Sequence, residues 1–236
     1  MLDRILVSNQ HKFMLVWNAK CACATAKVWF LNTHGVFEWA KSPHAECNNR
    51  GYALSNPYIL MEEPYKDFYK FIVVRNPWKR LVSYYVNKKI LMRDKNLNFP
   101  IELGNNSYSG DMTFTDLVNL LENVHPSRME EHVKCYSYGN VGLQFDRVVK
   151  VESLATDMKK VQEDLGLSDI INFEDFYYQP PSPYTDTTQN VSDKKPLDFD
   201  KDDIPSYEYF YTDELIEKVG KIYKQDIDLF DYKFED

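Results

Sequence analysis

Apolar residues recur along the chain in two alternating patterns, short continuous runs and longer stripes with helical spacing. The continuous runs predict buried strands at Lys12–Trp17 and Phe71–Val74, and the mixed segment Phe145–Val151 predicts a further strand. A helical stripe follows each run, as in the segment Thr25–Thr33. Because strands that alternate with helices form parallel sheets, the pattern predicts an α/β fold with a central, mainly parallel sheet.

The clearest strand-to-helix transition lies in "YKFIVVRNPWKRLVSYYVNKK". Asn76 is a good N-cap residue, and Pro77 fits the first helical turn. The helix that follows carries one apolar stripe with helical spacing: Trp78, Leu81, Val82, Tyr85 and Val86. We therefore expect this helix to begin directly after a buried strand.

The remaining chain is predicted from weaker signals. Helices are expected in "TFTDLVNLLENV" with Thr113 or Thr115 as cap, before Gly166, and across Asp213–Phe230. The turn-rich stretch from Gly35 to Met61 predicts loop with short elements. The long polar segment 176–211 predicts a lid or a solvated irregular segment. With no internal repeat, residues 1–236 are expected to form a single domain.

Charge is distributed unevenly along the sequence. The net charge of −8 and the isoelectric point near 5.2 argue against nucleic-acid binding, which needs a broadly basic face. Between Lys70 and Lys95, however, eight cationic residues face one acidic residue, Asp94. A basic segment in an acidic protein favours a small anionic ligand over a long polyanion.

The number of cysteines and the hydropathy of the chain indicate its cellular compartment. Four cysteines in 236 residues do not form a disulfide framework, although Cys21 and Cys23 are spaced as a possible metal or redox pair. No apolar stretch approaches the roughly 20 residues of a membrane span. We expect a soluble, cytoplasmic protein that has no contact with a membrane and no metal site.

The first candidate site lies in "WNAKCACATAKVWF", a strand, a turn of small residues and a helix. Such a turn exposes successive backbone N–H groups at the positive end of a helix, and Lys20 adds a point charge. Phosphate or sulfate fits that arrangement. Taken alone, however, this segment favours a tightly packed structural corner without ligand. The nucleotide-loop pattern GxxxxGK[ST] is absent, which disfavours a magnesium-dependent kinase or ATPase.

The second candidate site lies in "VVRNPWKRLVSYY". Arg75 ends a buried strand, where a guanidinium needs an anionic partner. Arg80 and Ser83 share one helix face because they are three residues apart. An arginine salt-bridged to a carboxylate beside an exposed serine is the alternative.

Together these segments resemble the PAPS-dependent sulfotransferases, specifically the Golgi carbohydrate type that modifies chondroitin. "AKCACATAK" is similar to the family's PKxxCTxxK loop, and "RNPWKRLVSYYVNK" to its RxPxxRLxSxYxxK motif. "MEEHVKC", "FDRVVKVESLATDMKKVQEDLGL" and "YTDELIEKVGKIYKQDIDLFDY" resemble later family segments in the same order. The sequence departs from the family pattern at Ala19, Ala24 and Val133, and we expect no membrane anchor of the kind that the Golgi enzymes carry. We therefore expect a soluble microbial or viral-like member.

The resemblance implies a P-loop-like three-layer α/β/α fold and in-line transfer of a sulfonate from PAPS to a hydroxyl, most simply on a carbohydrate, with PAP as product and no metal. It implies that Lys20 neutralises the leaving phosphate and that Arg75 and Ser83 hold the 3′-phosphate. The full set of expected PAPS-binding residues is Lys20, Cys21, Ala22, Cys23, Ala24, Thr25, Lys27, Arg75, Arg80 and Ser83. A protein that binds PAP without turnover, and an enzyme acting on a small molecule or on tyrosine, are the alternatives.

The acceptor hydroxyl needs a base, and histidine titrates in the required range. His44 lies between the two motifs, and His132 lies in "MEEHVKC"; both positions resemble histidines of the family. Both are therefore candidate catalytic residues, with His44 preferred. Glu46 and Glu38 are further candidates, because some sulfotransferases use a glutamate.

Overall fold

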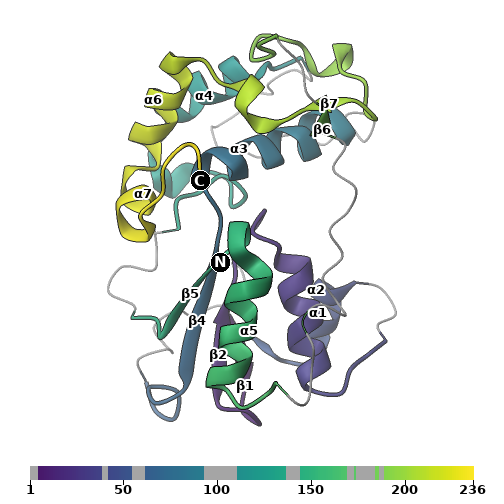
Figure 1. The fold of residues 1–236 in the computed structure, drawn as a ribbon, viewed down its shortest axis with the longest axis vertical. Helices are drawn as coiled ribbons and strands as arrows, with labels where there is room; N and C mark the ends of the chain where they lie inside the picture. The colour runs from purple at the N-terminus through teal and green to yellow at the C-terminus, as the bar shows by residue number, and fades with distance from the viewer. Residues whose placement is uncertain are drawn as a thin grey trace. The chain divides into compact units, whose positions relative to one another are not determined.

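The structure is a computed structural model, and it describes residues 5–38, 42–54, 62–92, 111–136, 144–168, 173, 184–185 and 189–236. It divides into two compact units, Met1–Arg75 with Gly139–Tyr178, and Asn76–Tyr138 with Gln179–Asp236. The boundary between them falls between Arg75 and Asn76, inside the second sequence motif. The two units are described separately below (Figure 1).

The first unit is built on a five-stranded sheet with strand order β3-β1-β2-β4-β5. Its strands are β1 (Ile5–Ser8), β2 (Phe13–Val16), β3 (Ala53–Leu54), β4 (Tyr69–Val74) and β5 (Arg147–Lys150). The pairs β2–β4 and β4–β5 are parallel, whereas β1 runs antiparallel to both β2 and β3. The predicted α/β class and the mainly parallel core are confirmed, and the antiparallel edge is an addition that the apolar runs did not predict.

Helices α1 (Cys23–Thr33), α2 (Pro43–Asn49) and α5 (Leu154–Asp164) belong to this unit. Trp29 of α1 packs against Phe13 and Phe71, with ring centroids 5.5 and 5.8 Å apart, so α1 covers the sheet face that carries these rings. All three rings are fully buried. α1 ends before Gly35 and α5 before Gly166, both at positive φ, as the sequence predicted.

The second unit is mostly helical. It contains α3 (Pro77–Tyr85), the π-helix η2 (Val86–Leu91), α4 (Phe114–Glu122), α6 (Asp213–Ile222) and α7 (Lys224–Phe230), with the short strands β6 (Tyr184–Thr185) and β7 (Ile204–Pro205). Short 3₁₀ turns lie at Pro126–Arg128, Pro196–Asp198 and Tyr207–Phe210, and a further one, Val151–Ser153, precedes α5 in the first unit. Asn76 caps α3 through its side-chain oxygen, and Thr113 forms a capping box with Asp116 at α4.

The single C-terminal helix expected over Asp213–Phe230 is wrong, because the helix breaks at Tyr223. Tyr223 is fully buried, and its hydroxyl donates to the carbonyl of Val133 at 2.6 Å. The break therefore coincides with an anchoring contact to the segment that carries His132. Of the segment 176–211, expected to be a lid or an irregular segment, residues 184–185 and 189–211 are described. Phe199 and Phe210 lie in the core of the second unit. Residues 176–183 and 186–188 lie outside the described residues.

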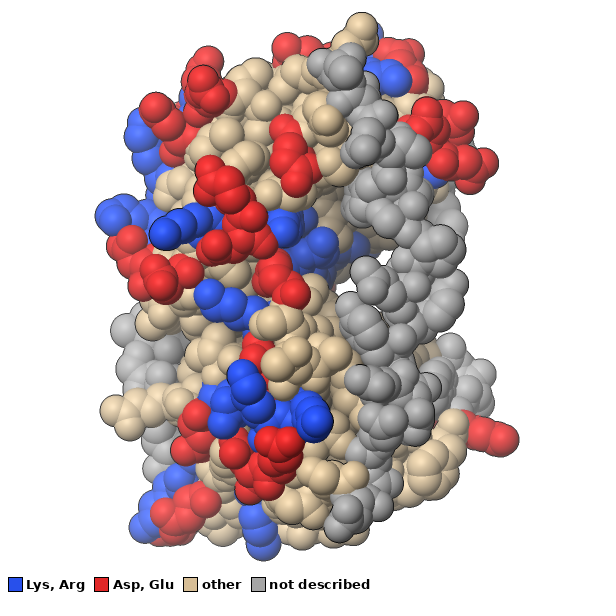
Figure 2. All heavy atoms as spheres, in the orientation of Figure 1, with Lys and Arg blue, Asp and Glu red and all other residues tan. Residues whose placement is uncertain are grey.

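Figure 2 shows acidic and basic side chains next to one another on the face that it presents. Partly exposed ion pairs join Arg147 to Asp164 in the first unit and Lys218 to Glu214 in the second, both at 2.7 Å. Such pairs neutralise charge locally and stabilise little. Among the described helices, none combines the length and the apolar character needed to cross a membrane.

Candidate functional site

The turn between β2 and α1 adopts an unusual backbone conformation. Lys20 and Ala22 both have positive φ, at 64° and 49°, although neither is glycine. Each such residue costs about 1–3 kcal/mol, and such strain is concentrated at binding and catalytic sites. Residues that alternate between left-handed and ordinary conformations turn successive N–H groups toward one point, which is a common way to hold an anion.

The start of α1 is also suited to an anion. Ala22 is its N-cap residue, and no side chain caps the helix. The first N–H groups, which begin at Cys23, therefore have no side-chain acceptor from the cap position, at the end of the helix that carries partial positive charge. Ala24 is exposed and Thr25 is half-buried, so Thr25 supplies the hydroxyl nearest to the position where the family pattern has threonine.

Arg75 joins this turn from the neighbouring strand. β2 and β4 are parallel, so both strands end at the same edge of the sheet, and Arg75 directly follows β4. Its Nη1 donates to the carbonyl oxygen of Lys20 at 3.2 Å. Its buried Nε has no hydrogen-bond partner among the residues that the structure describes. The structure thus brings Lys20 and Arg75 together, with one arginine donor left for a ligand.

Lys27 and His44 form a buried pair behind the turn. Lys27 is 2% exposed, and its ammonium lies 3.1 Å from the centre of the Trp17 ring. The same ammonium donates to Nδ1 of His44 at 2.6 Å. His44 Nε2 lies 3.9 Å from Sγ of Cys23. These contacts direct Lys27 toward His44 and the core, so it orients the histidine that follows the turn in sequence.

The second motif continues into the other unit, where Arg80 and Ser83 lie on α3. Ser83 is half-buried. Arg80 is only 1% exposed. Its Nη1 donates to the carbonyl of Lys134 at 2.9 Å, and its Nη2 lies 3.9 Å from a carboxylate oxygen of Asp226.

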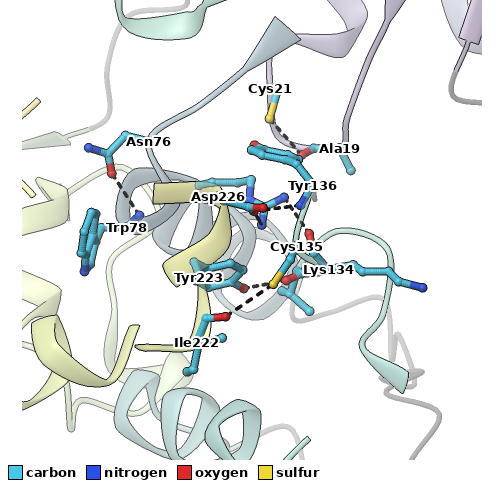
Figure 3. A network of polar contacts seen from close by, with 12 residues as sticks. Ala19, Cys21, Asn76, Trp78, Lys134, Cys135, Tyr136, Ile222, Tyr223 and Asp226 are labelled. Atoms are coloured by element: carbon cyan, nitrogen blue, oxygen red, sulfur yellow. Dashed lines mark hydrogen bonds and ion pairs between the residues drawn. The ribbon is translucent and has the colours of Figure 1, made fainter. Parts of the chain in front are cut away.

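Aromatic rings complete the surroundings of Arg80. The guanidinium carbon lies 4.0 Å from the ring centre of Tyr136 and 5.1 Å from that of Tyr223. Figure 3 shows Tyr136, Asp226, Cys135 and Tyr223 gathered in one network. Asp226 accepts from the backbone N–H of Tyr136 at 2.8 Å, and Cys135 Sγ donates to the carbonyl of Ile222 at 3.5 Å. We call Arg80, Asp226, Tyr136 and Tyr223 the arginine clasp; it ties segment 133–136 to α3 and to the α6–α7 junction.

His132 lies immediately before this clasped segment. Its Nδ1 contacts the Glu130 carboxylate in a short hydrogen bond, and its backbone N–H donates to the other Glu130 oxygen at 2.9 Å. Glu130 was not expected to take part, although its position two residues before His132 in "MEEHVKC" is the signal that could have revealed it. Glu38 is exposed, and Glu46 is ion-paired with Arg50 at 2.6 Å.

Metal-binding potential is confined to one group within the described residues, Glu130, Glu131 and His132. Because the Glu130 carboxylate already holds Nδ1 of His132, we interpret this group as a hydrogen-bonded pair with a neighbouring acid. The four cysteines are free. Burial raises the pKa of Cys47 and of Cys135 to about 11, so both thiols stay protonated near neutral pH.

Comparison with known proteins gives independent evidence on the family of the chain. A family model described as "Sulfotransferase family" matches residues 3–233. Carbohydrate sulfotransferase 14 from Homo sapiens is 26% identical over 198 residues, covering 78% of this chain and 52% of the relative. The protein of that name from Danio rerio is 24% identical over 202 residues, which cover 78% of this chain and 55% of the relative. The one from Mus musculus is 25% identical over 198 residues, which cover 78% of this chain and 52% of the relative.

The chain thus spans about half the length of the curated relatives that it matches. No solved structure gave a significant match. The family match covers nearly the whole chain, and it includes both motifs and both units. The chain therefore belongs to the sulfotransferase family.

Proposed function

We propose that the protein transfers a sulfonate group from PAPS to an acceptor hydroxyl on a carbohydrate. One observation supports the location of the site: Arg75, at the end of β4, donates a hydrogen bond to the turn at Lys20. The buried Nε of Arg75 has no hydrogen-bond partner among the described residues. An uncapped helix start lies in the same turn. The family membership and the printed names of the relatives supply the reaction class and the acceptor class.

In this proposal the backbone N–H groups from Cys21 to Thr25 and the Thr25 hydroxyl hold the 5′-phosphosulfate. Lys20 neutralises the charge that develops on the leaving phosphate, as fixed cations do in phosphoryl transfer. The strained backbone at Lys20 is already shaped for that anion, so binding does not have to supply the cost of forming it. Catalysis then consists of positioning and charge stabilisation.

Arg75 and Ser83 hold the 3′-phosphate, which distinguishes PAPS from ordinary nucleotides. Both belong to one motif that runs from β4 into α3. Lys27 and Arg80 are not proposed as phosphate ligands, since their cationic groups contact side chains and carbonyls of the protein. Chondroitin-type polysaccharides are the first acceptors to test, followed by small-molecule and tyrosine hydroxyls.

Calorimetry with PAP, AMP and ATP tests the nucleotide assignment. We expect wild-type protein to bind PAP more tightly than AMP, which lacks the 3′-phosphate. Arg75→Ala should weaken PAP binding about 10- to 100-fold, because a hydrogen bond to a charged group contributes about 1.5–3 kcal/mol. AMP binding should change little. Equal affinity for PAP and ATP, or unchanged PAP binding by Arg75→Ala, would overturn the assignment.

A transfer assay separates enzyme from binding protein. PAPS labelled with radioactive sulfur is incubated with a panel of desulfated glycosaminoglycans, and labelled polysaccharide is counted. Label on one of these polymers supports the proposal. Tight PAP binding with no transfer to any carbohydrate, small molecule or tyrosine peptide would identify a nucleotide-binding protein without turnover.

A further inference from the structure

A half-buried histidine lies where α1 ends. His34 is the C-cap residue of this helix, and its Nδ1 lies 2.9 Å from the carbonyl oxygen of Phe30. A carbonyl only accepts hydrogen bonds, so Nδ1 carries the proton and donates it to Phe30. In the neutral imidazole Nε2 is then an acceptor, and it lies 3.0 Å from the hydroxyl oxygen of Ser8, the last residue of β1. The Ser8 hydroxyl therefore donates to Nε2 of His34.

Ser8 connects this imidazole to the turn between β1 and β2. Its side chain is fully buried, and its hydroxyl oxygen also accepts from the backbone N–H of His11 at 3.0 Å. The side chain of His11 in turn reaches the end of the helix, because its Nε2 donates to the carbonyl oxygen of Thr33 at 2.9 Å. These contacts join α1 to the β1–β2 turn, and we call the residues that make them the histidine latch: Ser8, His11, Thr33 and His34.

The latch disfavours a second proton on His34. With that proton Nε2 would become a donor, and the hydrogen of the buried Ser8 hydroxyl would lose its acceptor. The titratable side chains that face His34 among the described residues are His11 and Tyr52, with ring centres 5.6 and 4.7 Å away, and neither is a carboxylate. Burial lowers the pKa of His34 below the ordinary value of 6.5; the hydrogen bond to Phe30 opposes this change, and His11 adds to it.

The effect on stability depends on the difference between the folded and the unfolded chain. In the unfolded chain His34 has the ordinary pKa of 6.5, and above that value the imidazole is neutral in both states. Below it, the unfolded chain takes up the proton more readily than the folded protein, so the free energy of unfolding falls as pH falls. The contribution of His34 is lost completely once pH drops below its lowered pKa in the folded protein.

The latch holds the far end of the helix that begins at the candidate site. β2 starts beside the latch at Phe13 and ends before the turn that carries Lys20, and α1 then runs from Cys23 to Thr33. A single helix of 11 residues, about 16 Å long, therefore connects the latch with the candidate site.

We propose that the histidine latch is a pH-sensitive device, which fixes the C-terminal end of α1 at neutral pH and releases it when His34 is protonated in mildly acidic solution. Release lets the end of α1 and the β1–β2 turn open locally, while the parallel core of the sheet stays folded. The turn at Lys20, at the other end of the same helix, then binds its anion less tightly; this second part rests on the proposed function.

Titration of the histidine side chains by NMR tests the latch in the wild-type protein. The imidazole of His34 should stay neutral to a lower pH than it does in a peptide of residues 28–38. In His11→Gln the glutamine can still donate to the carbonyl of Thr33 but carries no charge, so His34 should titrate at a higher pH than in the wild type. A folded-state pKa of His34 that equals or exceeds the peptide value would overturn the proposal.

His34→Gln is the matched variant for stability, because the glutamine oxygen can accept from Ser8 but takes up no proton. Between about pH 7.5 and about pH 5.5, the melting temperature should fall a few degrees further in the wild type than in His34→Gln. His125→Gln makes the same substitution at an exposed histidine of the second unit and should follow the wild type. Equal falls in the wild type and His34→Gln would contradict the latch.

Hydrogen exchange of the wild type locates the opening. After correction for the intrinsic effect of pH, amides of residues 8–13 and 30–36 should lose protection at the lower pH, whereas those of β4 should keep it. Loss of protection spread evenly over the sheet would overturn local release.

Calorimetry with PAP tests the link to the candidate site. Affinity should fall more steeply with acid in the wild type than in His34→Gln, and protonation of PAP itself is common to both proteins. Equal slopes would overturn the link between the latch and the turn at Lys20. Failure of PAP to bind at either pH would overturn the proposed function instead, and the NMR titration and hydrogen exchange would still decide on the latch.

Discussion

Arg75 and Arg80 belong to the same motif, yet the protein surrounds them differently. Arg75 has one hydrogen bond to a carbonyl at 3.2 Å and a buried Nε without a partner among the described residues. Arg80 has a carbonyl, the carboxylate of Asp226 and two aromatic faces around its guanidinium. The first arrangement leaves positive charge for a ligand, and the second uses it inside the protein.

The comparison shows that a motif mixes ligand-binding and structural residues. Arg80 is buried and therefore needs a counter-charge inside the protein, whereas Arg75 is half-buried, with its Nε enclosed. Asp226 lies beside the guanidinium of Arg80, which holds distant segments of the chain together. For Arg75, the proposed partner is the 3′-phosphate of the ligand. Removing each arginine should therefore produce different losses, one in stability and one in affinity.

The largest effect is expected for Arg80→Ala. It leaves the fully buried Asp226 without its cation, and breaking a buried ion pair costs about 3–5 kcal/mol of unfolding free energy. Urea denaturation followed by circular dichroism measures this loss. Arg80→Lys keeps the charge but loses the planar stacking, so its loss should be smaller.

PAP affinity provides the counter-test for Arg80. Under conditions in which the variant is still folded, Arg80→Ala should bind PAP as wild type does. A variant with wild-type stability but weakened PAP binding would make Arg80 a phosphate ligand and remove the distinction from Arg75.

Lys20→Ala should have the next largest effect, on turnover. Removing a group that stabilises charge in the transition state commonly costs about 100- to 1,000-fold in kcat. PAP binding should weaken much less, because the backbone N–H groups of the turn remain. Labelled-sulfonate transfer measures the first quantity and calorimetry the second. Equal losses in both would make Lys20 a binding residue only.

The fold was readable from the sequence where local and tertiary signals agree. Neighbouring residues alone predict several features: the buried strands β2 and β4, the helix cap at Asn76, and the helix ends before the glycines that follow α1 and α5. β1 was not among the predicted strands because its apolar run, Ile5–Val7, has only three residues. The break at Tyr223 was missed because it depends on a hydrogen bond to Val133, far away in sequence.

The site was only partly readable for the same reason. Lys20 and Arg75 were identified because strand ends in parallel sheets meet at one edge. Motif spacing could not show that Arg80 and Lys27 direct their charges into the protein. It also could not show that a lysine contacts Nδ1 of His44 whereas a glutamate contacts Nδ1 of His132. Tertiary partners decide these roles.

Ser83→Ala should produce the smallest effect and gives the finest test of the Arg75 assignment. Ser83 is half-buried and the substitution removes a single oxygen atom, so stability should change little. If Ser83 and Arg75 hold the same 3′-phosphate, the variant loses one hydrogen bond to a charged group, about 1.5 kcal/mol or roughly tenfold in PAP affinity. AMP affinity should not change. Calorimetry of Ser83→Ala, Arg75→Ala and the double variant then measures their coupling, and strictly additive losses would mean that the two residues do not share a phosphate.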